Sequence, residues 1–209
     1  MITLLSALAA YLLGSVSFAI IASRLFGLPD PRSYGSGNPG ATNVLRSGKR
    51  AAALVTLAGD VGKGLVAVLV ARYFSVQSGV GEAPAAAAGL AVFLGHLYPL
   101  YFRFRGGKGV ATASGVLFGF SPVLALLALL AFVVVAVVSR YVSLASVVAA
   151  VTAIVAAPLL LGWGATAGAA LLVSLLVIWR HRANLQRLFA GTERRLSFGS
   201  RDAPPAGGA

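Results

Sequence analysis

The sequence contains no cysteine, only two histidines and only five acidic residues among its 209 residues. The absence of cysteine excludes disulfide bonds, thiolate nucleophiles and cysteine-based metal sites. Two histidines, His96 and His181, cannot form a three-histidine metal site, and five acids argue against a carboxylate-rich metal cage. We therefore expect neither a metal nor a cofactor.

Charge is also scarce, since charged residues make up 11% of the chain against roughly 25% in an average soluble domain. Hydrophobic residues make up 58% and the mean hydropathy is +0.90, which argues against both a soluble globular fold and disorder. The composition instead predicts a protein embedded in a lipid bilayer. The formal net charge is nevertheless +12, so the positions of the few charges are informative.

Long apolar runs mark the expected membrane-spanning segments. Residues 2–23, about 51–71 and about 83–102 are each long enough as helices to cross a hydrocarbon core of about 30 Å. Residues 2–23 are interpreted as a spanning helix rather than a signal peptide, because nothing basic precedes them and Arg24 follows them.

Two longer uncharged stretches follow, at residues 109–139 and 141–179. The second must contain two helices, broken near Gly162. The first is either one tilted helix or two helices split at Ser121 and Pro122, and this choice decides whether the chain has six or seven spans. The piece from residue 109 to 120 is too short to cross alone, so a tilted or partly re-entrant half-helix is expected there.

The distribution of basic residues favours seven spans. With seven, every lysine and arginine except Lys63 and Arg72 lies on one face of the membrane, whereas six spans divide them almost equally. Because basic residues concentrate on the cytoplasmic side, the sequence predicts an all-α polytopic integral membrane protein with seven transmembrane helices, its N-terminus outside and its C-terminus cytoplasmic. Residues 1–193 form a single transmembrane domain in this prediction, and residues 194–209 a disordered basic tail.

Three polar segments fall on the predicted cytoplasmic face, at residues 36–46, 104–112 and 181–187, where they can converge on one site. The first is rich in glycine, which permits positive φ and close approach, so its backbone N–H groups can face an anion. Side-chain donors accompany those groups, and together they can hold a phosphate without metal. The donors are Ser36, Thr42, Asn43 and Arg46.

The second segment ends a loop and opens a helix, so the positive end of the helix dipole and Lys108 can face a second anion. It is not a P-loop, because Gly109 follows the lysine where Ser or Thr would bind Mg²⁺. The third segment contains His181 with Asn184 one turn later on the same face. His181 is therefore a better candidate for a general base than His96, which lies among apolar residues and is interpreted as a structural hydrogen bonder.

Asp60 and Lys63 lie three residues apart within a span. Such a pair is either a neutralised structural pair or part of a polar pathway, and the sequence does not decide between them.

Neither histidine begins the H-x4-D pattern of common glycerolipid acyltransferases, and the Asp-rich metal motif of CDP-alcohol transferases is absent.

Five segments carry a specific resemblance. Three of them resemble motifs of the bacterial acyl-phosphate-dependent glycerol-3-phosphate acyltransferases, the PlsY family. They are S-G-N-P-G-A-T-N-V-L-R from Ser36, G-H-L-Y-P-L-Y-F-R-F-R-G-G-K-G-V-A-T from Gly95 and H-R-A-N-L-Q-R-L-F-A-G-T-E from His181. D-V-G-K-G from Asp60 and R-Y-V-S-L from Arg140 resemble further segments of it. The match covers nearly the whole chain; Arg105, where lysine is common, departs from it and keeps the charge.

The resemblance implies a multi-pass enzyme of the bacterial inner membrane whose active site faces the cytoplasm. It implies transfer of a fatty acyl group from acyl phosphate to the 1-hydroxyl of sn-glycerol 3-phosphate, giving lysophosphatidate and phosphate, the first acylation of phospholipid synthesis. The bilayer and these two substrates are the expected partners, with no nucleic acid or protein partner indicated. The residues assigned to catalysis are Ser36, Arg46, Lys108, His181 and Asn184.

The residues assigned to substrate or phosphate binding are Ser36, Gly37, Asn38, Gly40, Thr42, Asn43, Arg46, Gly106, Gly107, Lys108, Gly109, Ser143, His181 and Asn184. Whether His181 or a substrate phosphate removes the hydroxyl proton stays open. Glu193 is expected to pair with local arginines. Two alternative functions would also use a basic face. An anion or organophosphate transporter would need polar residues through to the outer half of the membrane, but the outer ends near residues 79–82, 120–121 and 162–166 offer almost no donors. A non-catalytic protein that contacts anionic lipid would need charge but not this order of motif residues.

Overall fold

The computed structural model describes residues 1–196, and every regular element in this part of the chain is a helix. The first half of the chain contains α1 (Ile2–Gly14), α2 (Phe18–Leu25), α3 (Ala41–Leu45), α4 (Arg50–Ser78), α5 (Ala83–Leu97) and the short 3₁₀ helix η1 (Leu100–Phe102). The second half contains α6 (Val110–Phe120), α7 (Pro122–Ser139), α8 (Val142–Leu161), α9 (Ala165–Arg180) and α10 (Arg182–Phe189).

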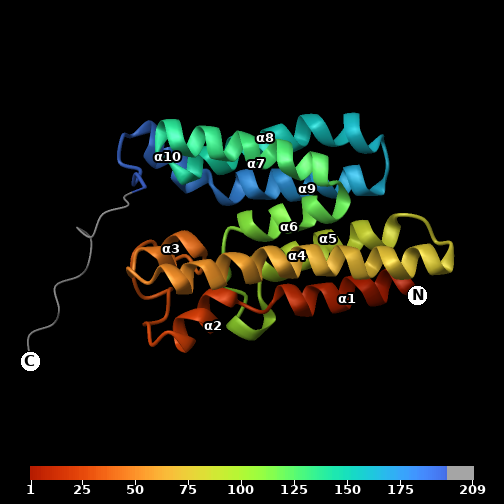
Figure 1. Ribbon diagram of the computed structural model, residues 1–209, viewed down its shortest axis with the longest axis horizontal. Helices are drawn as coiled ribbons and strands as arrows, with labels where there is room; N and C mark the ends of the chain where they lie inside the picture. The colour runs from red at the N-terminus through yellow and green to blue at the C-terminus, as the bar shows by residue number, and fades with distance from the viewer. Residues whose placement is uncertain (197–209) are drawn as a thin grey trace, which may run out of the picture.

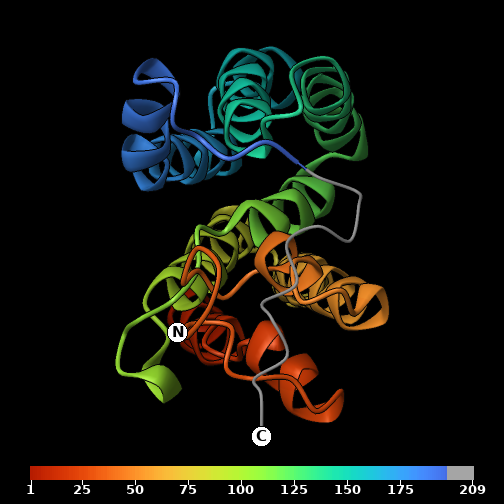
Figure 2. The same ribbon diagram turned by 90° about the vertical axis from the view of Figure 1, so that its left-hand side faces the viewer.

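The long helices run side by side in two layers (Figures 1 and 2). One layer contains α1, α2, α4 and α5, and the other contains α7, α8 and α9. Between them, α6 packs against α4 on one side and against α7 and α9 on the other. The helices α3 and α10 lie beside different layers at the same end of the molecule, opposite the N-terminus, and we call this end the α3–α10 end.

Five segments are long and apolar enough to cross a membrane: Ile2–Leu25, Arg50–Ser78, Ala83–Phe102, Pro122–Ser139 and Val142–Leu161. Two shorter apolar helices, Val110–Phe120 and Ala165–Arg180, complete the set. The predicted helix breaks at Ser121 and at Gly162 are confirmed. Side-chain capping explains the first break, since the Leu124 amide donates to Ser121 Oγ at 3.3 Å and Pro122 opens the next helix.

The first span differs from the continuous helix predicted for residues 2–23, because it is interrupted between Gly14 and Phe18. Gly14 packs directly on α5, where a Cβ atom would lie 2.2 Å from Val92 O. Ser15 Oγ donates back to Tyr11 O at 2.9 Å, a local bond that competes with helix continuation. Lys63 Nζ donates to the Val16 carbonyl that the interruption leaves free, at 2.7 Å.

Glycines allow α4 and α6 to approach closely. A Cβ atom at Gly64 would lie 2.4 Å from Thr112 O, and one at Gly115 would lie 2.0 Å from Val61 O. Both contacts are with backbone, which cannot give way locally. This close packing of small residues is typical of helices that associate within a membrane.

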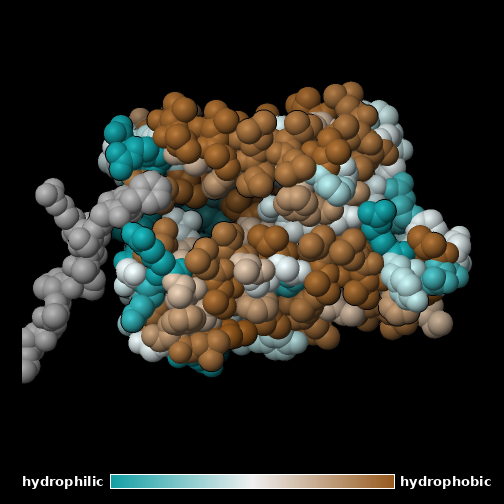
Figure 3. Space-filling model, viewed as in Figure 1, coloured by the Kyte–Doolittle hydropathy of each residue, from teal (hydrophilic) through white to brown (hydrophobic). Residues whose placement is uncertain are grey.

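The sides of the molecule are covered by apolar residues, and hydrophilic residues gather at its two ends (Figure 3). Val137 and Val138 of α7, and Leu159 of α8, are among the strongly exposed aliphatic side chains. Such a surface suits contact with lipid rather than water. Between the two layers the same view shows the surface hollowed toward the α3–α10 end.

The first residues of the predicted basic tail make contacts. The Leu196 amide donates to Arg140 O at 2.7 Å, and Arg195 Nε donates to the Tyr141 hydroxyl at 3.1 Å. The remainder of that predicted tail, residues 197–209, lies outside the described residues.

Candidate active site

The loop before α3 is organised by Asn43, whose side chain is buried. Asn43 Oδ1 accepts hydrogen bonds from the Ser36 amide at 2.9 Å and from Ser36 Oγ at 3.1 Å. Its Nδ2 donates to Pro31 O at 2.7 Å and to Tyr34 O at 3.2 Å. The amide of Asn43 is therefore engaged in bracing the loop, and its predicted contact with phosphate stays a prediction.

The remaining predicted residues of this loop stand on its accessible side. Ser36 and Gly37 are exposed, while Asn38, Gly40 and Thr42 are half-buried. Glycine is required at position 35, where φ is +61° and a Cβ atom would lie 2.2 Å from Asn43 Oδ1. Arg46 follows α3 directly and places its charge close enough to affect Lys108.

The turn at Gly106 and Gly107 packs against the end of α5. The Gly107 amide donates to His96 O at 3.2 Å, and a Cβ atom on Gly107 would lie 2.4 Å from His96 Nε2 and 3.2 Å from Pro39 O. The same turn is held from α9, because Arg180 donates to Gly107 O at 3.0 Å. This packing brings the first and second predicted segments into contact.

Gly109 completes this turn with φ at +82° and leads into α6. A side chain at Gly109 is excluded as well, because its Cβ would lie 2.3 Å from the Phe93 ring. Lys108 is therefore held between two glycines whose positions are fixed by α5.

Lys108 meets the third segment directly. Its Nζ donates to Asn184 Oδ1 at 2.5 Å, and Asn184 Nδ2 donates to Glu193 Oε1 at 2.7 Å. Ser143 Oγ donates to the same carboxylate oxygen at 2.7 Å. Four residues from three regions of the chain thus form one hydrogen-bonded group at the α3–α10 end.

The other oxygen of Glu193 pairs with Arg187, whose Nε lies 2.8 Å away. This confirms the expectation that Glu193 pairs with a local arginine. Burial alone would raise the pKa of Glu193, but the hydrogen bonds from Asn184, Ser143 and Arg187 hold it below the ordinary value. Glu193 is therefore an ionised carboxylate that orients Asn184.

Burial lowers the pKa of Lys108 to about 8, and repulsion from Arg187, Arg180 and Arg46 acts in the same direction against the attraction of Glu193. Among the described residues, the ammonium group is thus surrounded by cations and has Glu193 as its one nearby anion. Such a surrounding favours the binding of an additional anion, since an anion would relieve the repulsion.

His181 is buried at the junction of α9 and α10. Its Nδ1 lies 2.8 Å from Val177 O and must donate to that carbonyl, so Nε2 is the acceptor nitrogen of the neutral ring. Burial lowers the pKa of His181 to about 4, with a further contribution from Lys108. The ring is therefore neutral near pH 7, as a proton acceptor must be.

Arg180 is a site residue that the sequence interpretation did not single out. It donates to the Gly106–Gly107 turn, its Nε is buried without a hydrogen-bond partner, and its guanidinium lies 5.8 Å from the centre of the Tyr98 ring. The sequence signal was weak, because Arg180 directly follows the uncharged stretch 141–179 and lies two residues before Arg182, as an ordinary interfacial cation would.

Asp60 and Lys63 form a buried ion pair with 2.8 Å between Nζ and Oδ1. His96 joins them, with its Nδ1 3.0 Å from Lys63 Nζ. The pair is therefore neutralised internally, and its lysine binds the interruption of the first span. These contacts favour the structural interpretation of Asp60, Lys63 and His96 over a polar pathway.

Comparisons with known proteins agree along nearly the whole chain. Residues 4–191 match the family model described as glycerol-3-phosphate acyltransferase. The chain is 55% identical to the glycerol-3-phosphate acyltransferase of Cupriavidus metallidurans, over 94% of this chain and 97% of that protein, and 53% identical to that of Nitrosospira multiformis, over 90% and 94%.

The fold is similar to crystal structures of PlsY, described as an integral membrane glycerol 3-phosphate acyltransferase. The glycerol 3-phosphate form matches with a TM-score of 0.85 and 39% identity over 93% of this chain and 96% of that one. The lysophosphatidic acid form matches with a TM-score of 0.83 and 38% identity over 96% and 97%. The chain, an integral membrane enzyme by these matches, belongs to the glycerol-3-phosphate acyltransferase family.

Proposed function

We propose that this acyltransferase uses acyl phosphate as its donor and releases lysophosphatidate and inorganic phosphate. The observation that carries the proposal is the position of Lys108, which bonds to Asn184 amid the charges of Arg46, Arg180 and Arg187. Donor and acceptor would each bring a phosphate group, and a cation-rich site with two glycine turns suits two such groups. The glycerol 3-phosphate and lysophosphatidic acid forms of PlsY support the proposed acceptor and product.

The chemistry requires no enzyme nucleophile. The 1-hydroxyl oxygen of glycerol 3-phosphate attacks the acyl carbonyl carbon, forming the new ester bond as the carbon–oxygen bond to phosphate breaks. The phosphate leaves with the electron pair, and the hydroxyl proton passes to a base. The donor is already a mixed anhydride, so the residues need only bind, orient and stabilise charge.

Each predicted residue has a part in this scheme. Ser36, Thr42, Arg46 and Lys108 bind the phosphates and stabilise the leaving group, with the turns at Gly37, Asn38 and Gly40 and at Gly106, Gly107 and Gly109 allowing close approach. Asn43 and Ser143 support their neighbours through the hydrogen bonds described above. Asn184 and His181 orient the attacking hydroxyl, and its proton goes either to His181 Nε2 or to a substrate phosphate.

Ser36 does not serve as an acyl-enzyme nucleophile in this proposal. Its Oγ donates to Asn43 Oδ1, an amide oxygen that cannot act as a general base.

The proposed topology has seven spans, with the site at the cytoplasmic face of the bacterial inner membrane. The N-terminus and α10 lie at opposite ends of the molecule, which requires an odd number of crossings (Figure 1). The basic residues of the loops at the α3–α10 end support placing that end in the cytoplasm.

The test is an acylation assay with the full-length protein purified in lipid. Acyl phosphate and glycerol 3-phosphate should yield lysophosphatidate and phosphate without added metal, coenzyme A or acyl carrier protein. A parallel reaction supplies acyl-CoA in place of acyl phosphate. Product in the acyl-CoA reaction, with none in the acyl phosphate reaction, would overturn the proposed donor.

A further inference from the structure

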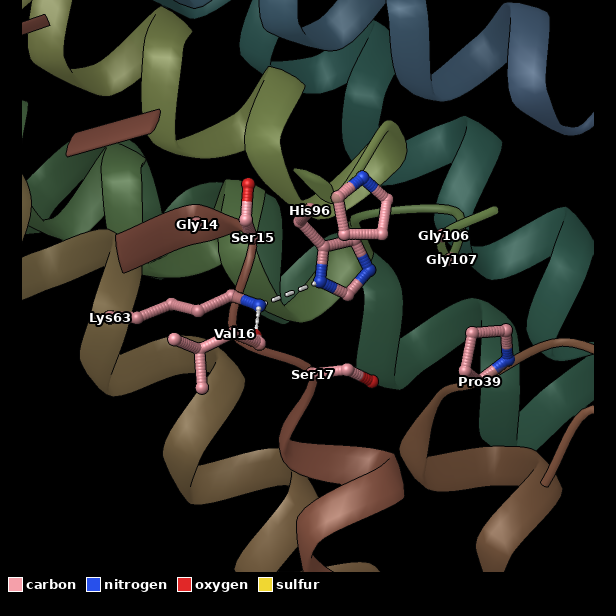
Figure 4. A pocket seen from close by; sticks show the side chains of 10 residues that line it. Gly14, Ser15, Val16, Ser17, Pro39, Lys63, His96, Gly106 and Gly107 are labelled. Atoms are coloured by element: carbon pink, nitrogen blue, oxygen red, sulfur yellow. Dashed lines mark hydrogen bonds between the residues drawn. The ribbon is translucent and has the colours of Figure 1, made fainter. Parts of the chain in front are cut away.

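Lys63 of α4 lies where this helix meets α5 and the connection between α1 and α2 (Figure 4). Its ammonium group lies 2.7 Å from Val16 O, 3.0 Å from His96 Nδ1 and 2.8 Å from Asp60 Oδ1. Val16 O and His96 Nδ1 are hydrogen-bonded to the ammonium group, whereas Asp60 balances its charge as an ion pair and its Oδ1 accepts no hydrogen bond from the described residues. A buried ammonium group with two hydrogen bonds and a balancing carboxylate is held firmly in one place.

His96 extends this junction to the Gly106–Gly107 turn. Lys63 donates to His96 Nδ1, so the proton of the neutral ring resides on Nε2, the nitrogen that faces Gly107. The His96 carbonyl accepts the Gly107 amide, and a Cβ atom on Gly106 would lie 2.0 Å from that carbonyl oxygen. Both the backbone and the ring of His96 therefore define where the turn runs.

The space between the junction and the turn is too small for a substrate. A cavity of about 10 Å³ is lined by Val16, Ser17, Lys63, His96, Gly106 and Gly107. That volume suffices for about one water molecule. The cavity beside these buried charges is therefore too small to hold a substrate, and the neighbouring element that they contact is the Gly106–Gly107 turn, which Lys108 follows.

We propose that Lys63 and His96, with Asp60 balancing the charge, are positioning residues that set the place of Lys108 in the active site. Lys63 fixes the His96 ring, His96 fixes the Gly106–Gly107 turn, and the turn fixes the residue that follows it. The inference rests on the proposed role of Lys108 in phosphate binding.

The primary test replaces the ion pair as a unit. Removing one partner alone would leave an uncompensated buried charge, whereas removing both is often tolerated. The double variant Asp60→Asn/Lys63→Met and the single variant His96→Leu should each raise the KM for glycerol 3-phosphate at least tenfold and lower kcat. His96→Asn, whose Oδ1 can accept from Lys63 in place of Nδ1, should return KM to within about threefold of the unaltered protein.

A matched control separates positioning from general destabilisation. Arg72→Met removes another contact from α4, the 2.8 Å bond to Gly119 O at the end of α6, and leaves the Gly106–Gly107 turn untouched. This variant should lower the melting temperature without changing KM. Amide hydrogen exchange of residues 104–109 should become faster in the double variant and in His96→Leu, but not in Arg72→Met.

The inference is overturned if the double variant and His96→Leu keep KM, kcat and exchange of residues 104–109 within twofold of the unaltered protein. A Lys108→Met variant, assayed with whichever acyl donor supports turnover, distinguishes this failure from failure of the proposed function. Normal KM in Lys108→Met would refute the role of Lys108 itself. A raised KM in Lys108→Met, together with an unchanged KM in the double variant and in His96→Leu, would refute only the positioning by Lys63 and His96.

Discussion

Lys108 Nζ donates a 2.5 Å hydrogen bond to Oδ1 of Asn184, which lies 76 residues further along the chain. The bond links the turn before α6 to α10, and therefore links the two layers of helices at the α3–α10 end. Asn184 is in turn oriented by Glu193 at 2.7 Å. The position of the lysine charge is thus set by residues from both layers, and three predictions concern this arrangement.

The first prediction concerns pH. Burial lowers the pKa of Lys108 to about 8, so the amine is charged below that pH and loses its charge above it. The KM for glycerol 3-phosphate should therefore rise as the pH increases through about 8, when initial rates are measured between about pH 7 and 9.5. In Lys108→Arg the side chain stays charged over this range, so its KM should not change with pH. An equally steep rise in Lys108→Arg would assign the effect to another group.

A second prediction addresses the base. If His181 Nε2 accepts the hydroxyl proton, both His181→Ala and His181→Asn should lower kcat by about 10²–10⁴-fold, the usual contribution of general base catalysis. If a substrate phosphate accepts the proton and His181 only orients the hydroxyl, His181→Asn should keep most of the activity that His181→Ala loses. The kcat values of the two variants, compared at pH 7, decide between these outcomes.

The third prediction concerns Glu193. Glu193→Ala removes the partner of Asn184, Ser143 and Arg187 together, and should lower kcat/KM by about 10–100-fold, equivalent to about 1.4–2.7 kcal/mol. Glu193→Gln keeps an oxygen that can accept from Asn184 and should lose less. Steady-state kinetics of both variants measure this difference. Equal losses would show that the charge of Glu193, rather than its orientation of Asn184, is what matters.

The fourth prediction tests the close approach of α4 and α6. In Gly115→Ala the new methyl group would meet Val61 O at 2.0 Å, so the helices must separate and the free energy of unfolding should fall by about 1–3 kcal/mol. Gly62→Ala, on the same pair of helices, meets nothing within 4 Å and should be neutral or slightly stabilising. Thermal melting of the two variants in the same detergent provides the comparison. A similar loss in Gly62→Ala would show that the contact with Val61 O is not the cause of the loss in Gly115→Ala.

Local signals in the sequence marked Ser121 and Gly162 as helix breaks, and the distribution of basic residues decided in favour of the break at Ser121. Proline and glycine act on the backbone where they stand, so their effects can be predicted from the sequence alone. The meeting of Lys108 with Asn184 was anticipated only as a possible convergence of three segments on one face. The hydrogen bonds that realise it depend on how α9 packs against α5 and α6.

The interruption after Gly14 could not be predicted in the same way. The hydropathy of residues 2–23 is uninterrupted, and the group that satisfies the free Val16 carbonyl lies 47 residues away, on Lys63. The bracing role of Asn43 was also hidden, because an amide side chain in a glycine-rich loop suits an anion as well as it suits the loop's own backbone. In both cases the decisive partner is fixed by tertiary packing.

The lengths of the helices that follow α6 have a consequence for the surrounding membrane. With 18 residues α7 is about 27 Å long, and with 16 residues α9 is about 24 Å long, whereas the hydrocarbon core is about 30 Å thick. The 20 residues of α8 give about 30 Å, which matches the core, so only α7 and α9 are shorter than the bilayer, and the exposed Trp163 stands between α8 and α9 where an interfacial side chain suits this mismatch. Since α9 ends directly before His181, we expect the candidate active site to respond to bilayer thickness through this helix.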